Sequence, residues 1–126
     1  YLGAVTIYRS KDIKELKDKD AREEARAENE QALAFLEDEL TNDGFVVAFA
    51  EGTRYPKTMG EFKHGFFELA VKVERKSGKK VSFLPVGTEY SGRDVRIAFG
   101  ESLRYTVDIT NLINECKESV RKLSNL

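Results

Sequence analysis

A run of apolar residues that ends abruptly in polar groups is the most chemically informative part of this chain. Residues 45–50, Phe-Val-Val-Ala-Phe-Ala, are uncharged and rich in β-branched and aromatic side chains, which predicts a buried strand. Glu51, Gly52, Thr53 and Arg54 follow at once. In open α/β sheets, ligands bind at the carboxyl ends of strands. Because glycine lets a ligand approach the backbone and arginine offers a planar fork, these four residues predict a phosphate or carboxylate site.

Two further cations come from neighbouring predicted elements. Arg9 ends a predicted strand over residues 4–8, and Lys63 stands at the beginning of a predicted helix. If the strands lie side by side in the same direction, Arg9 and Arg54 converge, and two guanidiniums suit a phosphate dianion. The helix dipole near Lys63 favours the same anion, and Glu51 is predicted to hold the cations in place. The structural alternatives are solvated side chains for Arg9 and Lys63, and a turn-closing salt bridge between Glu51 and Arg54.

The elements that must position these residues alternate along the chain. Helical periodicity predicts three helices, over residues 20–43, 62–76 and 108–123. Gly44 is predicted to be the left-handed residue that ends the first of them. Uncharged or alternating runs predict four strands, over residues 4–8, 45–50, 81–86 and 95–99. The order β-α-β-α-β-β-α predicts an α/β fold, a single domain with a mixed, mostly parallel sheet flanked by helices.

Composition narrows the class of protein. With 126 residues the chain is long enough for one domain with a real core. Its formal net charge of -1 argues against a nucleic-acid binder that relies on bulk positive charge. The single Cys116 excludes an internal disulfide framework and, lying on an apolar stripe, is predicted to be core packing. The charged N-terminal half of the helix at residues 20–43 is predicted to face water, with contact to lipid headgroups or a partner as the alternative.

Several blocks, in order along the chain, carry a family resemblance. Residues 51–54, Glu-Gly-Thr-Arg, and residues 62–70, beginning Phe-Lys-His-Gly, resemble the Phe-Pro-Glu-Gly-Thr-Arg-Ser and Phe-Lys-x-Gly blocks of the glycerolipid acyltransferases. Residues 3–9 resemble the upstream block Gly-x-Ile-Phe-Ile-x-Arg of this family. Residues 83–86, with Pro85 in a strand, resemble the downstream block, and residues 95–103 resemble the final strand and its Gly-Glu-Pro-like exit. The resemblance implies a fold like that of glycerol-3-phosphate acyltransferase.

The chain also departs from the family pattern. Ala50 replaces a proline and Tyr55 replaces a serine, and both changes are mild. The catalytic pair of the family, His-x-x-x-x-Asp, has no counterpart, because the single His64 is followed five residues later by Leu69. No catalytic residue is therefore expected in this chain, and the pair is expected upstream of Tyr1. The 126 residues are accordingly expected to be the C-terminal part of one acyltransferase domain whose N-terminal part is missing.

The resemblance implies transfer of a fatty acyl group from acyl-CoA or acyl-carrier protein to 1-acyl-glycerol-3-phosphate, giving phosphatidic acid in phospholipid biosynthesis. Glycerol-3-phosphate or another lysolipid is the alternative acceptor. The acceptor would be bound by six residues: Arg9, Glu51, Gly52, Thr53, Arg54 and Lys63. No metal ion or organic cofactor is implied, because the thioester donor is already activated. The implied location is the cytoplasmic face of a membrane, reached peripherally or through an anchor in the missing part, with no nucleic-acid partner.

Two interpretations other than an enzyme stay open. Without a base, the protein would be a non-catalytic module that binds phospholipid headgroups or acyl donors. The second alternative is an interaction protein that uses the charged helix at residues 20–43 to bind its partner.

Overall fold

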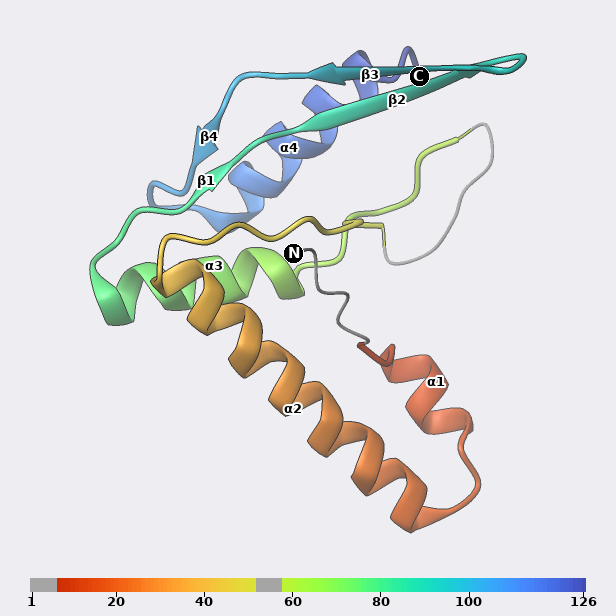
Figure 1. Cartoon of the computed structure of the whole chain (residues 1–126), viewed down its shortest axis with the longest axis vertical. Coiled ribbons are helices and arrows are strands. Elements are labelled where there is room, and N and C mark those ends of the chain that lie inside the picture. The colour runs from red at the N-terminus through yellow and green to blue at the C-terminus, as the bar shows by residue number, and fades with distance from the viewer. Residues whose placement is uncertain (1–6, 52–57) are drawn as a thin grey trace. The chain divides into compact units, whose positions relative to one another are not determined.

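The computed structural model describes residues 7–51 and 58–126 of the chain (Figure 1). It comprises two units, Tyr1–Val46 and Val47–Leu126, which we call the first and second unit and describe separately.

The first unit is built on two helices, α1 (Ser10–Glu15) and α2 (Lys19–Thr41). The side chain of Asp18 caps α2 by accepting a hydrogen bond from the backbone N–H of Asp20 at 3.1 Å. Ile13 of α1 is buried, and so are three apolar residues along one stripe of α2: Ala25, Ala32 and Leu36. The helix predicted at residues 20–43 is thus confirmed, with one narrow buried face. The short helix α1 is an addition that the sequence interpretation did not contain.

The end of α2 corrects a prediction about Gly44. The left-handed residue is Asp43, with φ of 64°, a conformation that aspartate tolerates better than most residues. Gly44 serves a different purpose, because its N–H donates to the Glu39 carbonyl at 2.7 Å. A Cβ at position 44 would lie only 2.7 Å from that same oxygen. A glycine is therefore needed at position 44 because the Glu39 carbonyl lies too close for a side chain, and not because of the backbone conformation.

The second unit contains α3 (Gly65–Ser77) and α4 (Ile109–Leu123), close to the helices predicted at residues 62–76 and 108–123. Gly78 ends α3 in the left-handed conformation, with φ of 74°. Asp108 caps α4 through hydrogen bonds from the backbone N–H groups of Thr110 and Asn111. The main difference is that α3 begins three residues later than predicted, since the Phe62 ring enters the core and the Lys63 N–H bonds elsewhere.

Four short strands form two antiparallel pairs in the second unit. They are β1 (Ser82–Phe83), β2 (Val86–Ser91), β3 (Asp94–Phe99) and β4 (Leu103–Arg104), paired as β1 with β4 and β2 with β3. Gly92, with φ of 60°, occupies the first position of the two-residue turn between β2 and β3. The strand predicted at residues 95–99 is confirmed. The one predicted at residues 81–86 is interrupted at Leu84 and Pro85, where the chain changes partner from β4 to β3.

The mostly parallel sheet is not found among the described residues. Both strand pairs are antiparallel, and a two-residue turn between β2 and β3 permits no other direction. The strand predicted at residues 45–50 is wrong, because this segment has no strand partner in the described part of the chain. Its aromatic side chains are accordingly exposed, Phe45 by 74% and Phe49 by 86%. The strand predicted at residues 4–8 falls mostly outside the described residues.

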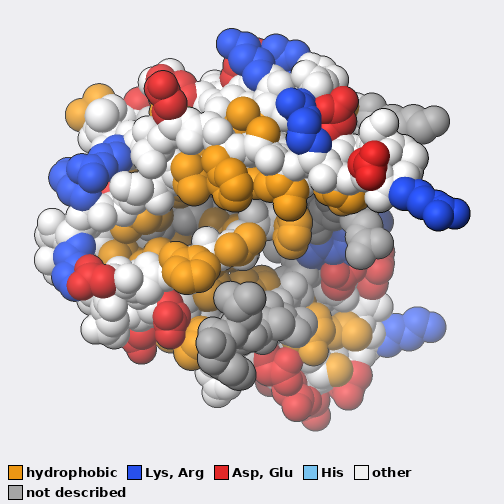
Figure 2. Space-filling view, turned by 45° about the horizontal axis from the view of Figure 1, so that its top comes forward, with side chains coloured by type: hydrophobic (Ala, Val, Ile, Leu, Met, Phe, Trp, Pro, Cys, Tyr) orange, Lys and Arg blue, Asp and Glu red, His pale blue; other side chains and the backbone are white. Residues whose placement is uncertain are grey.

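Apolar side chains of the hairpin β2–β3 are also exposed on one face, among them Tyr90, Val95, Ile97 and Phe99. Figure 2 shows hydrophobic side chains gathered on the surface of the protein. In the part of the chain that the structure describes, no helix is both long and apolar enough to cross a membrane.

The core of the second unit lies between α3, α4 and the β1–β4 pair. Its buried cluster consists of Phe62, Phe67, Leu112, Ile113 and Cys116. The Phe67 ring stacks on the Phe83 ring of β1, with centroids 5.2 Å apart and planes inclined by 12°. Val73 of α3 is completely buried. These contacts link both helices to the β1–β4 pair, so the second unit has one hydrophobic centre.

Close packing of β2 on α4 depends on Gly87. A Cβ at this position would lie 2.5 Å from the carbonyl carbon of Leu123, a backbone atom that cannot move aside. We expect Gly87→Ala to lower the free energy of unfolding by about 1–3 kcal/mol, as overpacking does. Urea denaturation followed by circular dichroism measures this change.

Gly65→Ala is the matched control. A Cβ on Gly65, the first residue of α3, would meet no atom within 4 Å. Alanine also favours helix, so this variant is expected to be as stable as the parent or slightly more stable. Equal stability of the two variants would contradict the close packing at Gly87.

Candidate functional site

Two hydrogen bonds join the predicted anion site to the segment that precedes α3. The backbone N–H of Lys63 donates to the carbonyl of Ala50 at 2.6 Å. The backbone N–H of Gly60 donates to Oε2 of Glu51, also at 2.6 Å. We call these four residues the motif junction. It brings Glu51 and Lys63 together, as the sequence interpretation required, although no strand precedes Glu51.

The motif junction is anchored to the core of the second unit. Phe62, next to Lys63, is only 8% exposed, and Ala50 and Met59 pack against the same buried cluster. Glu61 forms an ion pair with Lys117 of α4, with Nζ and Oε1 2.6 Å apart. The hydrogen bond from Lys117 lowers the pKa of the Glu61 carboxyl below its ordinary value. The junction is therefore attached to α4 by a polar contact, the Glu61–Lys117 pair, and by apolar contacts within the buried cluster.

Lys63 is exposed and lies just before α3, whose N-cap residue is His64. The N–H groups of the first helical turn carry partial positive charge, which adds to the charge of a nearby ammonium. Position and exposure therefore suit contact with an anion. His64 is likewise exposed, and its side chain makes no capping hydrogen bond to the helix.

Arg9 lies in the first unit and is the N-cap residue of α1. Its Nε and Nη2 donate to the two oxygens of Asp12 at 2.8 and 3.0 Å, a bidentate pair. These hydrogen bonds lower the pKa of the Asp12 carboxyl, so the pair persists at neutral pH. The segment before Arg9 is held by Asn29 of α2, whose amide accepts from the Tyr8 N–H at 2.7 Å and donates to the Tyr8 carbonyl at 2.8 Å.

The remaining predicted residues are not all described. Gly52, Thr53 and Arg54 lie outside the described residues, so the convergence of Arg9 with Arg54 stays a prediction. The structure unites Glu51 with Lys63 in the second unit and places Arg9 in the first.

Sequence reasoning missed four supporting residues. The N–H of Gly60 binds Glu51, and no sequence pattern indicates that a glycine nine positions further along the chain would do so. Asn29 stands among charged residues of α2, and an uncharged amide there was a signal that could have been noticed. Lys117 and Glu61 are separated by 56 positions, and no local pattern links residues so distant in the chain.

Cys116 is confirmed as a core residue rather than a nucleophile. It is 5% exposed and belongs to the buried cluster. Burial raises the pKa of the thiol to about 11, because a thiolate is poorly solvated among apolar side chains.

This burial predicts slow reaction of Cys116 with alkylating reagents. At pH 8 only about one thiol in a thousand would be ionised in the folded protein, compared with roughly a quarter for a free cysteine. We expect iodoacetamide labelling, measured by intact mass, to be at least about 100-fold slower in buffer than in 6 M urea. Equal rates would show that the thiol is exposed.

The hydrogen bond between Glu51 and Gly60 predicts different behaviour for two variants. Glu51→Gln keeps an acceptor for the Gly60 N–H, whereas Glu51→Ala removes it and should destabilise the junction by about 1 kcal/mol. The Gly60 amide should therefore exchange with deuterium about five times faster in Glu51→Ala than in Glu51→Gln. Identical protection in both variants would argue against this bond.

The comparisons with known proteins give one match. The family model described as Acyltransferase matches residues 2–89. The match includes the blocks at residues 3–9, 51–54, 62–70 and 83–86, whereas the block at residues 95–103 lies beyond it. No curated protein and no solved structure matches the chain.

Proposed function

Because the chain belongs to the acyltransferase family, we propose that the protein moves a fatty acyl group from acyl-CoA or acyl-carrier protein to 1-acyl-glycerol-3-phosphate, giving phosphatidic acid. Family membership supports acyl transfer as the class of reaction. Acceptor, donor and place of action are parts of the proposal. Glycerol-3-phosphate presents the same phosphate and is the nearest alternative acceptor.

The motif junction is the observation that carries this proposal. Its two hydrogen bonds, from Lys63 to Ala50 and from Gly60 to Glu51, place the beginning of the Glu-Gly-Thr-Arg block beside the Phe-Lys-x-Gly block. Both blocks belong to the family resemblance described above, and their cationic members, Arg54 and Lys63, suit a phosphate dianion.

The proposed mechanism uses residues of the two blocks to hold the acceptor. Arg54 and Lys63 bind the acceptor phosphate, and Glu51, Gly52 and Thr53 shape the surrounding backbone. The contribution predicted for Arg9 is not part of this proposal, because its guanidinium is paired with Asp12 in the first unit. The acceptor hydroxyl loses its proton to a base, and its oxygen bonds to the thioester carbonyl carbon. The carbon–sulfur bond then breaks, and the departing sulfur takes the proton from the base and leaves as a thiol. We expect the base, a histidine oriented by an aspartate, in sequence upstream of Tyr1.

The substrates suggest where the protein acts. Acceptor and product are lipids with charged headgroups, so we propose that the reaction takes place at the cytoplasmic face of a membrane. Because the donor thioester is already activated, the proposed reaction needs no metal ion or organic cofactor.

Arg54→Ala tests the role of the phosphate site. Losing one charged hydrogen-bonding partner of the phosphate costs about 1.5–3 kcal/mol, so KM for 1-acyl-glycerol-3-phosphate should rise about 10- to 100-fold. The KM of Arg54→Lys should lie between those of the parent protein and Arg54→Ala, because lysine keeps the charge but not the bidentate geometry. Steady-state kinetics with the full-length protein and radiolabelled acyl donor measure both effects.

Arg93→Ala is the matched control, since Arg93 lies in the turn between β2 and β3. Undiminished acceptor affinity in Arg54→Ala would remove Arg54 from the site. If the full-length protein binds lysophosphatidic acid but forms no product with either donor, it is a lipid-binding module instead.

A further inference from the structure

A pocket of about 340 Å³ lies in the second unit, between α3 and the segment that leads into α4. Its apolar wall consists of Val71 from α3 together with Tyr105 and Ile109. Its rim carries three cations of α3, Lys72, Arg75 and Lys76. A concave site with an aromatic and aliphatic wall and a few charged groups is typical of small-molecule binding, and this volume lies within the usual range of about 300–1,000 Å³.

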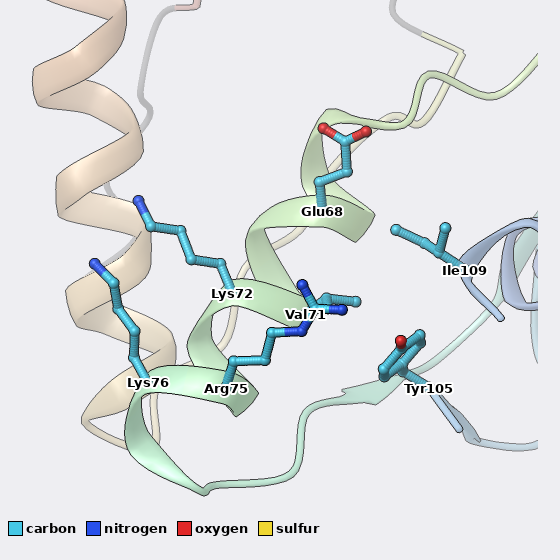
Figure 3. Close-up of a pocket in the computed structure, with 7 residues that line it drawn as sticks. All are labelled: Glu68, Val71, Lys72, Arg75, Lys76, Tyr105 and Ile109. Atoms are coloured by element: carbon cyan, nitrogen blue, oxygen red, sulfur yellow. The ribbon is translucent and has the colours of Figure 1, made fainter. Parts of the chain in front are cut away.

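Figure 3 shows how these side chains are arranged around α3. Arg75 extends on the side of the helix where Tyr105 and Ile109 lie, whereas Lys72 and Lys76 leave the helix on the other side. Glu68 lies nearer the N-terminus of α3, at the far end of the pocket from Arg75. Among residues 7–51 and 58–126, the Arg75 guanidinium has no ion-pair partner, so it is available for an anion.

The C-terminal half of α3 and the loop after it are strongly basic. Residues 72–80 contain five lysines and arginines and one carboxylate, Glu74, although the whole chain has a net charge of -1. Glu74 is already engaged, because its Oε1 accepts from the Val81 N–H at 2.8 Å and its Oε2 lies 4.0 Å from Lys80. Within residues 72–80 the positive side chains therefore outnumber the carboxylates by five to one.

We propose that this pocket binds the 3′-phosphoadenosine end of acyl-CoA. The adenine ring would lie against Tyr105, Val71 and Ile109, and the ribose phosphate would accept hydrogen bonds from Arg75. This inference rests on the proposed function and deepens it, because it selects the nucleotide donor over acyl-carrier protein. A carrier protein presents no planar base for an aromatic-walled concavity, whereas a nucleotide presents both the base and the phosphate that the pocket suits.

Adenosine 3′,5′-bisphosphate is a suitable probe, because it contains the nucleotide but no thioester and no acceptor. Isothermal titration calorimetry with the full-length protein should detect binding of the bisphosphate, and Arg75→Ala should raise the Kd at least about tenfold. The Tyr105→Phe variant should bind the bisphosphate with the same Kd as the parent protein, since stacking needs the ring and not the hydroxyl group. Arg93→Ala serves as the matched control, and inorganic phosphate at the same concentration should bind much more weakly than the bisphosphate.

Kinetics provide a second measurement. Arg75→Ala should raise KM for acyl-CoA about tenfold while leaving KM for the lysophosphatidic acid acceptor unchanged. The inference is overturned if the bisphosphate does not bind, if Arg75→Ala binds it as tightly as Arg93→Ala, or if only acyl-carrier protein supports turnover. Bisphosphate binding without acyl transfer from any donor would instead sustain the pocket and overturn the proposed function, so the two failures are distinguishable.

Discussion

Attachment of the motif junction to the core of the second unit is the constraint on which the candidate site depends. Hydrogen bonds from Lys63 to Ala50 and from Gly60 to Glu51 join two chain segments that flank residues 52–57. These bonds persist only if the segments stay in place, and Phe62 fixes one of them by inserting its ring into the buried cluster. A polar arrangement is thus stabilised by apolar burial next to it, since exposed hydrogen bonds alone contribute little net free energy.

Helix α4 links this junction to the remainder of the second unit. Lys117 on its surface pairs with Glu61, its buried face supplies Leu112, Ile113 and Cys116, and its C-terminal end packs closely on Gly87 of β2. One amphipathic helix therefore supports both the candidate acceptor site and the strands. The pocket beside α3 shares this support through Ile109, the first residue of α4. Donor and acceptor sites, if both are as proposed, would be built on the same core.

Sequence patterns predicted the helices well and the sheet poorly. Helices α2, α3 and α4 follow from apolar spacing, from capping by Asp18 and Asp108, and from the left-handed Gly78, all of which act within a few residues. A strand, in contrast, needs a partner elsewhere in the chain for its backbone hydrogen bonds. Residues 45–50 have the composition of a buried strand, yet in the described structure they find no partner and expose Phe45 and Phe49.

The sequence by itself determined the family, the helices and the types of residue in the candidate site, because motif spacing and helical periodicity are local properties of the chain. Only the tertiary structure decided that Gly60 binds Glu51, that Asn29 holds Tyr8, and that Arg9 pairs with Asp12. It also decided that the described strands pair in antiparallel fashion and that Arg75 faces an aromatic wall. Such contacts depend on which distant segments share a core, and their free energy is gained only when the whole unit has folded.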